Sequence, residues 1–290
     1  MIMNHIKQAI NMKNIQLLLC ASIFSGIIFS CEQKEKTIPS ESEKKTLPQD
    51  SLSQADLFMQ YENAKKMKEI DQRINPKNRV ESLRWEKQTK DHGSEFIEVV
   101  AYLNEDGMPM KITEFFIGGN FRPQGERHFY LENNKIIGFQ ENADFWVDSL
   151  LTNYSEKRTV YNDNKPVLTQ FRTAYQYNEI QDSTWKIIPE EHHSLKTVNK
   201  ILTGSDEFQT HFISVIKGEH LFLLLGENKP QTEERYTTAV RVDKMTPFIG
   251  ELLSDLDKYK FYPVEINFEV IGGDNQPEFR VLTDIQWKNK

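Results

Sequence analysis

The spacing of apolar and polar positions changes along the chain and divides it into four stretches. Residues 15–29 form an uncharged, mostly apolar run, and residues 32–53 contain almost no large apolar side chains. Beyond residue 53 the apolar positions first recur every three or four residues and then, from Leu83, every second residue. The first of these spacings is typical of an amphipathic helix and the second of β-strands.

The three-and-four spacing predicts a helix over residues 53–74. Ser53 and Asp56 fit a capping box at its start, and Asn75-Pro76 ends it because the residue before a proline disfavours helical geometry. We expect its apolar stripe to lie over a sheet; the alternative is an amphipathic helix that binds a partner. The stripe consists of Leu57, Tyr61, Ala64, Met67, Ile70 and Ile74.

The two-residue spacing predicts strands between Leu83 and Tyr177. Segments of Asn, Asp, Glu, Lys and Gly separate them at residues 104–107, 132–135 and 162–165, in a degenerate repeat of about 30 residues. Asn, Asp and Gly accept the left-handed conformations of tight turns, and turns this short join only antiparallel neighbours. We therefore predict an antiparallel β-meander, interrupted over residues 142–151 and followed by a helix over 188–202 that ends at Gly204.

The last part of the chain has its own order of elements. We expect strands over residues 208–216, 220–225 and 236–242, a helix over 247–256, and strands over 262–270 and 279–287. This order resembles an OB-fold barrel. The predicted fold is mainly β, within the α+β class: an N-terminal amphipathic helix packed on an antiparallel β-meander over residues 53–203, followed by a small OB-like β-barrel domain over residues 204–290.

The apolar run at residues 15–29 is typical of a secretory signal peptide. It follows two lysines and is shorter than the roughly 20 residues that a transmembrane helix needs, so a membrane span is the weaker alternative. The run ends in Ile28-Phe29-Ser30-Cys31, which resembles the lipobox of bacterial envelope lipoproteins of the Bacteroidota type. The resemblance implies that residues 1–30 are a lipoprotein signal peptide and that Cys31 is the site of lipidation.

Residues 31–52 are rich in Ser, Pro, Lys and Glu, and we expect a flexible tether because they cannot bury enough apolar surface to fold. The lipid on Cys31, as the resemblance implies, attaches the chain to the membrane. The expected location is the cell envelope, lipid-anchored to the outer membrane and either periplasmic or surface-exposed.

Composition and motifs argue against several classes of function. The net charge of −7 argues against a nucleic-acid partner, and two Cys exclude a disulfide scaffold or a Cys-rich zinc module. The sequence contains no nucleophile elbow, phosphate-binding loop, dinucleotide fingerprint or CxxC motif. Residues 190–193 (EEHH) have metal-ligand side chains, but adjacent positions on a helix point about 100° apart. We expect a solvated helix start there, and neither a metal nor a cofactor.

Catalysis by carboxylates is the remaining enzymatic possibility. A polysaccharide hydrolase needs two carboxylates about 5–10 Å apart across a cleft, and we assign no catalytic residue because turns and helix ends also explain such acids. The pairs considered are Glu105/Asp106, Asp144/Asp148 and Asp255/Asp257.

Aromatic residues are in excess, with 18 Phe and 10 Tyr. Adjacent aromatic pairs in a strand must place one ring on each face. Either the N-terminal helix covers the second set of rings, or these rings form an exposed patch that binds a partner. The candidate partner-binding residues are Phe115, Phe116, Phe145, Trp146, Tyr175 and Tyr177.

The sequence favours a non-enzymatic, lipid-anchored envelope protein that serves as a binding or interaction module for a protein, peptide or glycan partner. The alternative is an envelope polysaccharide hydrolase that uses a carboxylate pair. A third hypothesis is a structural subunit of a larger envelope complex. A cleft with two facing carboxylates would favour the hydrolase, and an aromatic patch would favour the binding module.

Overall fold

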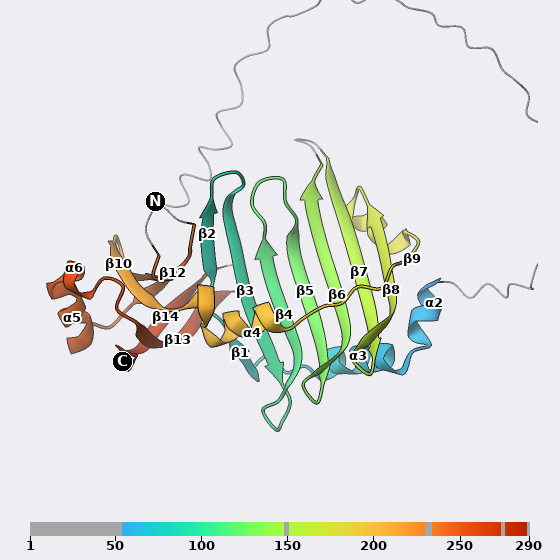
Figure 1. Cartoon of the computed structure of the whole chain (residues 1–290), viewed down its shortest axis with the longest axis horizontal. Helices are drawn as coiled ribbons and strands as arrows, with labels where there is room; N and C mark the ends of the chain where they lie inside the picture. The colour runs from blue at the N-terminus through green and yellow to red at the C-terminus, as the bar shows by residue number, and fades with distance from the viewer. Residues whose placement is uncertain (1–53, 148–150, 230–233, 274–275, 289–290) are drawn as a thin grey trace, which may run out of the picture. The chain divides into compact units, whose positions relative to one another are not determined.

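The computed structural model describes residues 54–147, 151–229, 234–273 and 276–288, and in these ranges the chain is mainly β, as predicted. Its strands form one large mixed sheet of 14 strands, most of them antiparallel to their neighbours (Figure 1). The described residues belong to one compact unit. The predicted signal peptide, the tether and Cys31 lie outside the described residues.

The predicted N-terminal helix consists of two shorter helices, α2 (Gln54–Met59) and α3 (Glu62–Arg73). The helix is interrupted because Tyr61, at the N-cap of α3, adopts an extended conformation. Ala64, Met67 and Ile70 of α3 are buried, as the apolar stripe predicts. They pack on strands β6 and β7 of the sheet, so the helix covers part of one face.

The predicted antiparallel meander is confirmed. From β2 to β9, each strand pairs with the next one along the chain, and β1 pairs with β3 beside β2. The strands are β1 (Arg79–Glu81), β2 (Trp85–Thr89), β3 (Gly93–Leu103), β4 (Pro109–Ile117), β5 (Gln124–Glu132), β6 (Lys135–Trp146), β7 (Thr152–Asn162), β8 (Lys165–Ala174) and β9 (Lys186–Ile188), with the 3₁₀ helix η1 (Tyr177–Asp182) between the last two.

Two of the predicted turns have the geometry of two-residue hairpins. Asn133 and Asn134 have φ of 52° and 61°, and Asp163 and Asn164 have φ of 49° and 63°. A type I′ turn requires positive φ at both central residues, which Asn and Asp tolerate better than other side chains. Close to each of these turns the register shifts by one residue, between Tyr130 and Leu131 and between Val160 and Tyr161.

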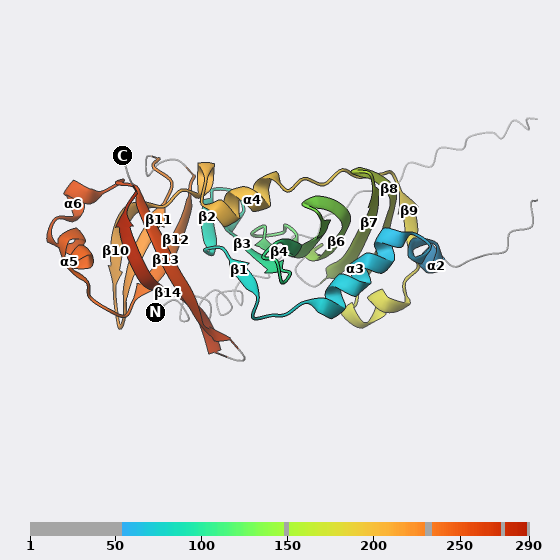
Figure 2. The ribbon, with the colours of Figure 1, turned by 90° about the horizontal axis from the view of Figure 1, so that it is seen from below.

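Helices cover both faces of the meander (Figure 1 and Figure 2). Helix α4 (Lys196–Thr203) contacts β3 on one face, here called the α4 face, and α3 contacts β6 and β7 on the other, the α3 face. The α4 face buries Val99, Ala101, Ile112, Phe129, Phe139, Val198 and Ile201. The α3 face buries Met110, Tyr130, Ile137, Val160 and Leu168 against Phe58, Ala64, Met67 and Ile70.

The helix expected over residues 188–202 is shorter than predicted. Residues 189–194 have no helical geometry, and α4 begins only at Lys196. The side-chain hydroxyl of Tyr161 accepts a hydrogen bond of 2.7 Å from the backbone N–H of His193, which holds this segment against β7. Gly204 is the left-handed C-cap of α4, with φ of 58°, as predicted. The interruption expected over 142–151 is also too long, because β6 continues to Trp146.

The C-terminal strands continue the same sheet across the predicted domain boundary at residue 204. Strand β12 pairs with β11 along its length, with β2 at Tyr236 and Thr237, and in parallel with β14 at Arg241. The elements are η2 (Asp206–Phe208), β10 (His211–Lys217), β11 (Leu221–Gly226), β12 (Tyr236–Val242), α5 (Pro247–Ser254), α6 (Leu256–Tyr259), β13 (Val264–Gly273) and β14 (Gln276–Trp287).

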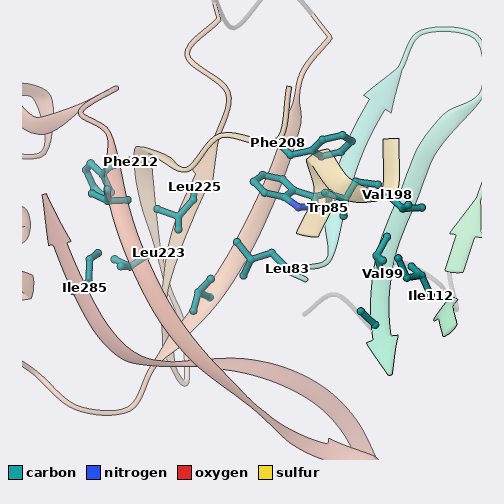
Figure 3. Packing of buried hydrophobic residues seen from close by; sticks show 14 of the residues in the cluster. Leu83, Trp85, Val99, Ile112, Val198, Phe208, Phe212, Leu223, Leu225 and Ile285 are labelled. Atoms are coloured by element: carbon teal, nitrogen blue, oxygen red, sulfur yellow. The ribbon is translucent and has the colours of Figure 1, made fainter. Parts of the chain in front are cut away.

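The predicted OB-like barrel is not found as a closed barrel among the described strands. In the described residues, β10 is linked to the segment before β13 by one isolated β-bridge, between His211 and Pro263, and by backbone hydrogen bonds of Phe212 with Phe261 and Tyr262, without a continuous strand ladder. The core of these strands is continuous with that of the meander: Trp85 lies between Phe208 and Leu83, with Val99 and Val198 on one side and Leu225 and Phe212 on the other (Figure 3). Trp85 and Phe208 pack edge to face, with ring centroids 5.7 Å apart.

Candidate functional site

The α3 face carries a groove at the end of the sheet where β4 ends and β5 begins. It consists of two hollows, of about 550 Å³ and about 400 Å³, that meet at Phe115, Gly125 and Asp144. The first is lined by Arg84, Phe96, Ile97, Glu98, Phe115, Phe116, Ile117, Gln124, Gly125 and Asp144. The second is lined by Phe115, Gly125, Glu126, Asn142, Ala143, Asp144, Tyr154, Ser155, Glu156, Tyr177 and Ile180.

The register of the meander explains why rings and carboxylates meet in the groove. Residues directly opposite each other on neighbouring strands share one face of a sheet. One row across the sheet runs through Phe115, Glu126, Asn142 and Glu156, and the next runs through Ile117, Gln124, Asp144 and Tyr154. The groove therefore has two parallel rows of side chains, each with apolar and polar members.

Glu126 is an ionised hydrogen-bond acceptor at neutral pH. The hydrogen bond from His128, whose Nε2 lies 3.2 Å from Glu126 Oε1, lowers the pKa of this carboxyl to about 2. The amide of Asn142 donates a second hydrogen bond, of 3.2 Å, to the same oxygen. His128 is held in turn by Thr113, with Oγ1 and Nδ1 3.0 Å apart.

The other carboxylates of the groove are also fixed by neighbours. Gln124 donates a 3.0 Å hydrogen bond to Asp144. Arg172 donates to Glu156 through Nε at 2.8 Å, and Arg84 donates to Glu98 through Nε at 2.8 Å. Glu98 also forms an ion pair with Arg280 of β14. Each carboxylate thus has a defined position and keeps unused acceptor capacity.

The structure separates the six predicted partner-binding residues. Phe115 is 40% exposed and lies where the two hollows meet, and Tyr177 lines the second hollow, packed edge to face on Tyr154 with ring centroids 5.7 Å apart. Trp146 is exposed and shares this face, because it follows Asp144 by two residues along β6.

The remaining three candidates do not line the groove as exposed rings. Phe116 and Phe145 point to the α4 face: Phe116 is buried, with the guanidinium of Arg127 4.1 Å from its ring centroid, and Phe145 is half-buried. Tyr175 is exposed just beyond the end of β8. The expectation that adjacent pairs divide between two faces is confirmed by Phe115 and Phe116.

Sequence reasoning missed several polar and aromatic residues of the groove. Gln124, Glu126, Asn142, Tyr154 and Glu156 lie opposite Phe115, Ile117 or each other across the strands. Their two-residue spacing along each strand places them on one face, but their proximity depends on the register between strands.

The predicted acid pairs do not form a two-carboxylate site in the described residues. Glu105 and Asp106 lie in an exposed turn at the opposite end of the strands. Asp255 caps α6 by accepting a 3.1 Å hydrogen bond from the N–H of Lys258. Asp144 lies in the groove, whereas its predicted partner, residue 148, is outside the described residues.

The Glu190–His193 cluster does not converge on one point. Glu191 pairs with Lys157 at 2.9 Å, and His193 stacks on Phe139 with ring centroids 3.5 Å apart. Burial lowers the pKa of His193 to about 4. Glu190 and His192 are exposed. Across the described ranges, no three His, Cys, Asp or Glu side chains are arranged to hold a metal ion.

No described helix is both long and apolar enough to cross a membrane. Comparison with known proteins gives no relative: no family model, curated protein or solved structure matches this chain.

Proposed function

We propose that this protein is a non-enzymatic, lipid-anchored envelope protein that binds a partner in the groove on its α3 face. The observation that carries the proposal is the combination of exposed rings, Phe115 and Tyr177, with carboxylates that neighbouring side chains already hold in place. Exposed apolar surface beside fixed polar groups is typical of a binding site. The anchor at Cys31 rests on the lipobox resemblance of the sequence.

The hydrolase alternative finds less support in the groove. A glycosidase needs one carboxyl group that holds a proton near neutral pH, whereas Glu126 has a pKa of about 2. Glu98 and Glu156 are paired with arginines. Burial raises the pKa of Glu114, but this residue lies on the α4 face and is paired with Arg127 at 2.7 Å. Asp144 is the remaining carboxyl group for such chemistry.

We further propose that the last five strands form a partly open, OB-like module. Their pairing order, β10-β11-β12-β14-β13 with α5 between β12 and β13, supports this proposal. We propose no nucleic-acid ligand for it. Phe208 and Phe212 are buried in the core, so these two rings cannot stack on bases, and the net negative charge of the chain does not suit the basic groove that such binding uses.

The proposal is tested by purifying the full-length anchored protein from its native membrane, as wild type and as Phe115→Ala, and comparing the molecules that come with it. We expect a component that accompanies the wild type and is lost from Phe115→Ala. Met245→Ala, which removes a large exposed side chain outside the groove, is the matched control and should retain the component. A component retained equally by all three proteins would remove the support for the groove as the binding site.

A further inference from the structure

The floor of the groove offers no backbone hydrogen bonds to a ligand. Strands β3 to β7 each pair with a neighbour on both sides, so their N–H and C=O groups are already used in the sheet. A peptide that binds by adding a strand needs a free sheet edge. On the floor of the groove, a ligand must therefore be recognised by side chains.

The polar side chains of the groove call for a ligand that donates hydrogen bonds. Glu126, Asp144 and Glu156 are carboxylates, and an ionised carboxylate accepts hydrogen bonds but does not donate them. The two amides beside them, Gln124 and Asn142, already donate to these carboxylates. Free acceptor sites thus outnumber free donors, which complements hydroxyl or ammonium groups.

Arginines already pair with two of the four groove carboxylates, Glu98 and Glu156. Glu126 and Asp144 instead accept hydrogen bonds from amide or histidine side chains. Beside the arginines, a cation would lose its hydration and recover only part of that cost. A neutral hydroxyl group avoids this cost and still donates to the fixed carboxylates.

The aromatic rings of the groove also suit a sugar ligand. A pyranose ring presents apolar C–H groups on its faces and hydroxyl groups around its edge, and an aromatic side chain offers a flat apolar surface of similar size. Phe115 stands between the two hollows, and Tyr177 stands at the far side of the second. Each hollow is within the range of about 300–1,000 Å³ typical of small-ligand sites.

We propose that the groove binds a glycan, as a chain of neutral sugar rings that passes over Phe115 from one hollow to the other. This inference rests on the proposed function, because it names the ligand class of the same groove. The rings pack on Phe115 and Tyr177, and their hydroxyl groups donate to Glu126, Asp144 and Glu156.

The test is isothermal titration calorimetry of the full-length protein in a detergent without a sugar headgroup. The probes are cellohexaose, maltohexaose, hexalysine, and polysaccharide released from the envelope of the producing cells. We expect at least one carbohydrate probe to bind, and Phe115→Ala and Tyr177→Ala each to weaken that binding by about fivefold or more. Asp144→Asn should weaken it as well, and Met245→Ala should not. Both replaced rings are exposed, so circular dichroism should show unchanged folding.

Four results would overturn the glycan assignment. Hexalysine binding without any carbohydrate binding would identify a cationic ligand. Carbohydrate binding that is equal in wild type and the Phe115 and Tyr177 variants would place the sugar elsewhere. If no probe binds but Phe115→Ala still loses a protein component in the membrane purification, the glycan assignment fails and the proposed function stands. If the purification also shows no loss, both fail.

Discussion

At the scale of single residues, His193 and Glu126 show opposite effects of their surroundings on proton binding. His193 is half-buried and stacked on Phe139, and this burial favours the neutral imidazole. Glu126 has a hydrogen-bonding histidine and an amide beside it, and these donors favour the charged carboxylate. The first residue holds the segment before α4 on the sheet, and the second is part of the groove.

His193 makes the stability of the fold depend on pH in the mildly acidic range. Its pKa falls from an ordinary value of 6.5 to about 4 in the folded protein. The unfolded chain therefore binds more protons between these values, and the free energy of unfolding should fall as the pH drops from 6.5 toward 4. His193→Phe keeps a stacked ring without a titrating group and should lose this part of the pH dependence.

The measurement is urea unfolding at pH 7 and pH 4.5. His192→Phe is the matched control, since the neighbouring side chain is exposed, and it should keep the pH dependence of the wild type. An unchanged difference between the two pH values in His193→Phe would contradict the assignment of the effect to this histidine.

At the scale of elements, the sequence predicts best what depends on neighbouring residues. The turns at Asn133-Asn134 and Asp163-Asn164, the left-handed Gly204 and the extent of β12 all follow from local patterns. The pairing of β12 with β2 joins Thr237 to Glu86, and no local pattern identifies such a partner. The groove escapes prediction for the same reason, because its rows exist only once the register of the strands is known.

The packing of α3 on the sheet depends on the absence of a side chain at Gly138. A Cβ atom at this position would overlap the side chain of Met67, which is 2% exposed and has little room to move. Gly138→Ala should therefore destabilise the fold by about 1–3 kcal/mol, the usual cost of overfilling a packed core. Chemical denaturation of the variant and the wild type gives this difference.

Gly250→Ala provides the control for Gly138→Ala. Gly250 lies within α5 with open space around its Cβ position, so an alanine there should be neutral or stabilising by up to about 1 kcal/mol. The double variant Gly138→Ala with Met67→Ala should cost less than the sum of the two single changes, because the overlap is removed. A simple sum would show that Gly138 and Met67 do not interact.

At the scale of the whole molecule, one buried ion pair connects the meander to the C-terminal strands. Arg280 of β14 and Glu98 of β3 are 4% and 8% exposed and contact each other, and Arg84 also pairs with Glu98. Burial lowers the pKa of Arg280 to about 10, so the guanidinium remains charged at neutral pH. The contact links residues on either side of the predicted boundary at residue 204.

Removing one partner of this pair should be costly. Glu98→Ala leaves the guanidinium of Arg280 buried with less compensation, and the expected loss in the free energy of unfolding is about 3–5 kcal/mol. The double variant Glu98→Met with Arg280→Met should recover much of that loss. Calorimetry of both variants gives the comparison, and a loss below 1 kcal/mol in Glu98→Ala would show that the pair behaves as a surface contact.

Attachment to the membrane should depend on Cys31, although this residue lies outside the described ranges. Cys31→Ser should abolish acylation, because serine has no thiol, and should move the protein to the soluble fraction of the cell. Metabolic labelling with a radioactive fatty acid, followed by fractionation, measures both effects. Cys20→Ser is the control and should remain acylated; acylation that survives Cys31→Ser and is lost in Cys20→Ser would reassign the lipid.

The repeated hairpins of the meander allow the sheet to gain or lose strands during evolution. Each repeat of about 30 residues is a strand, a short turn and a strand, and it pairs with the next repeat in an antiparallel ladder, as it does with the previous one. If one repeat were duplicated or deleted, the side chains of the remaining strands would keep their places on the α4 face or the α3 face. The groove runs across these strands, so its length is a property that evolution can adjust in whole hairpins.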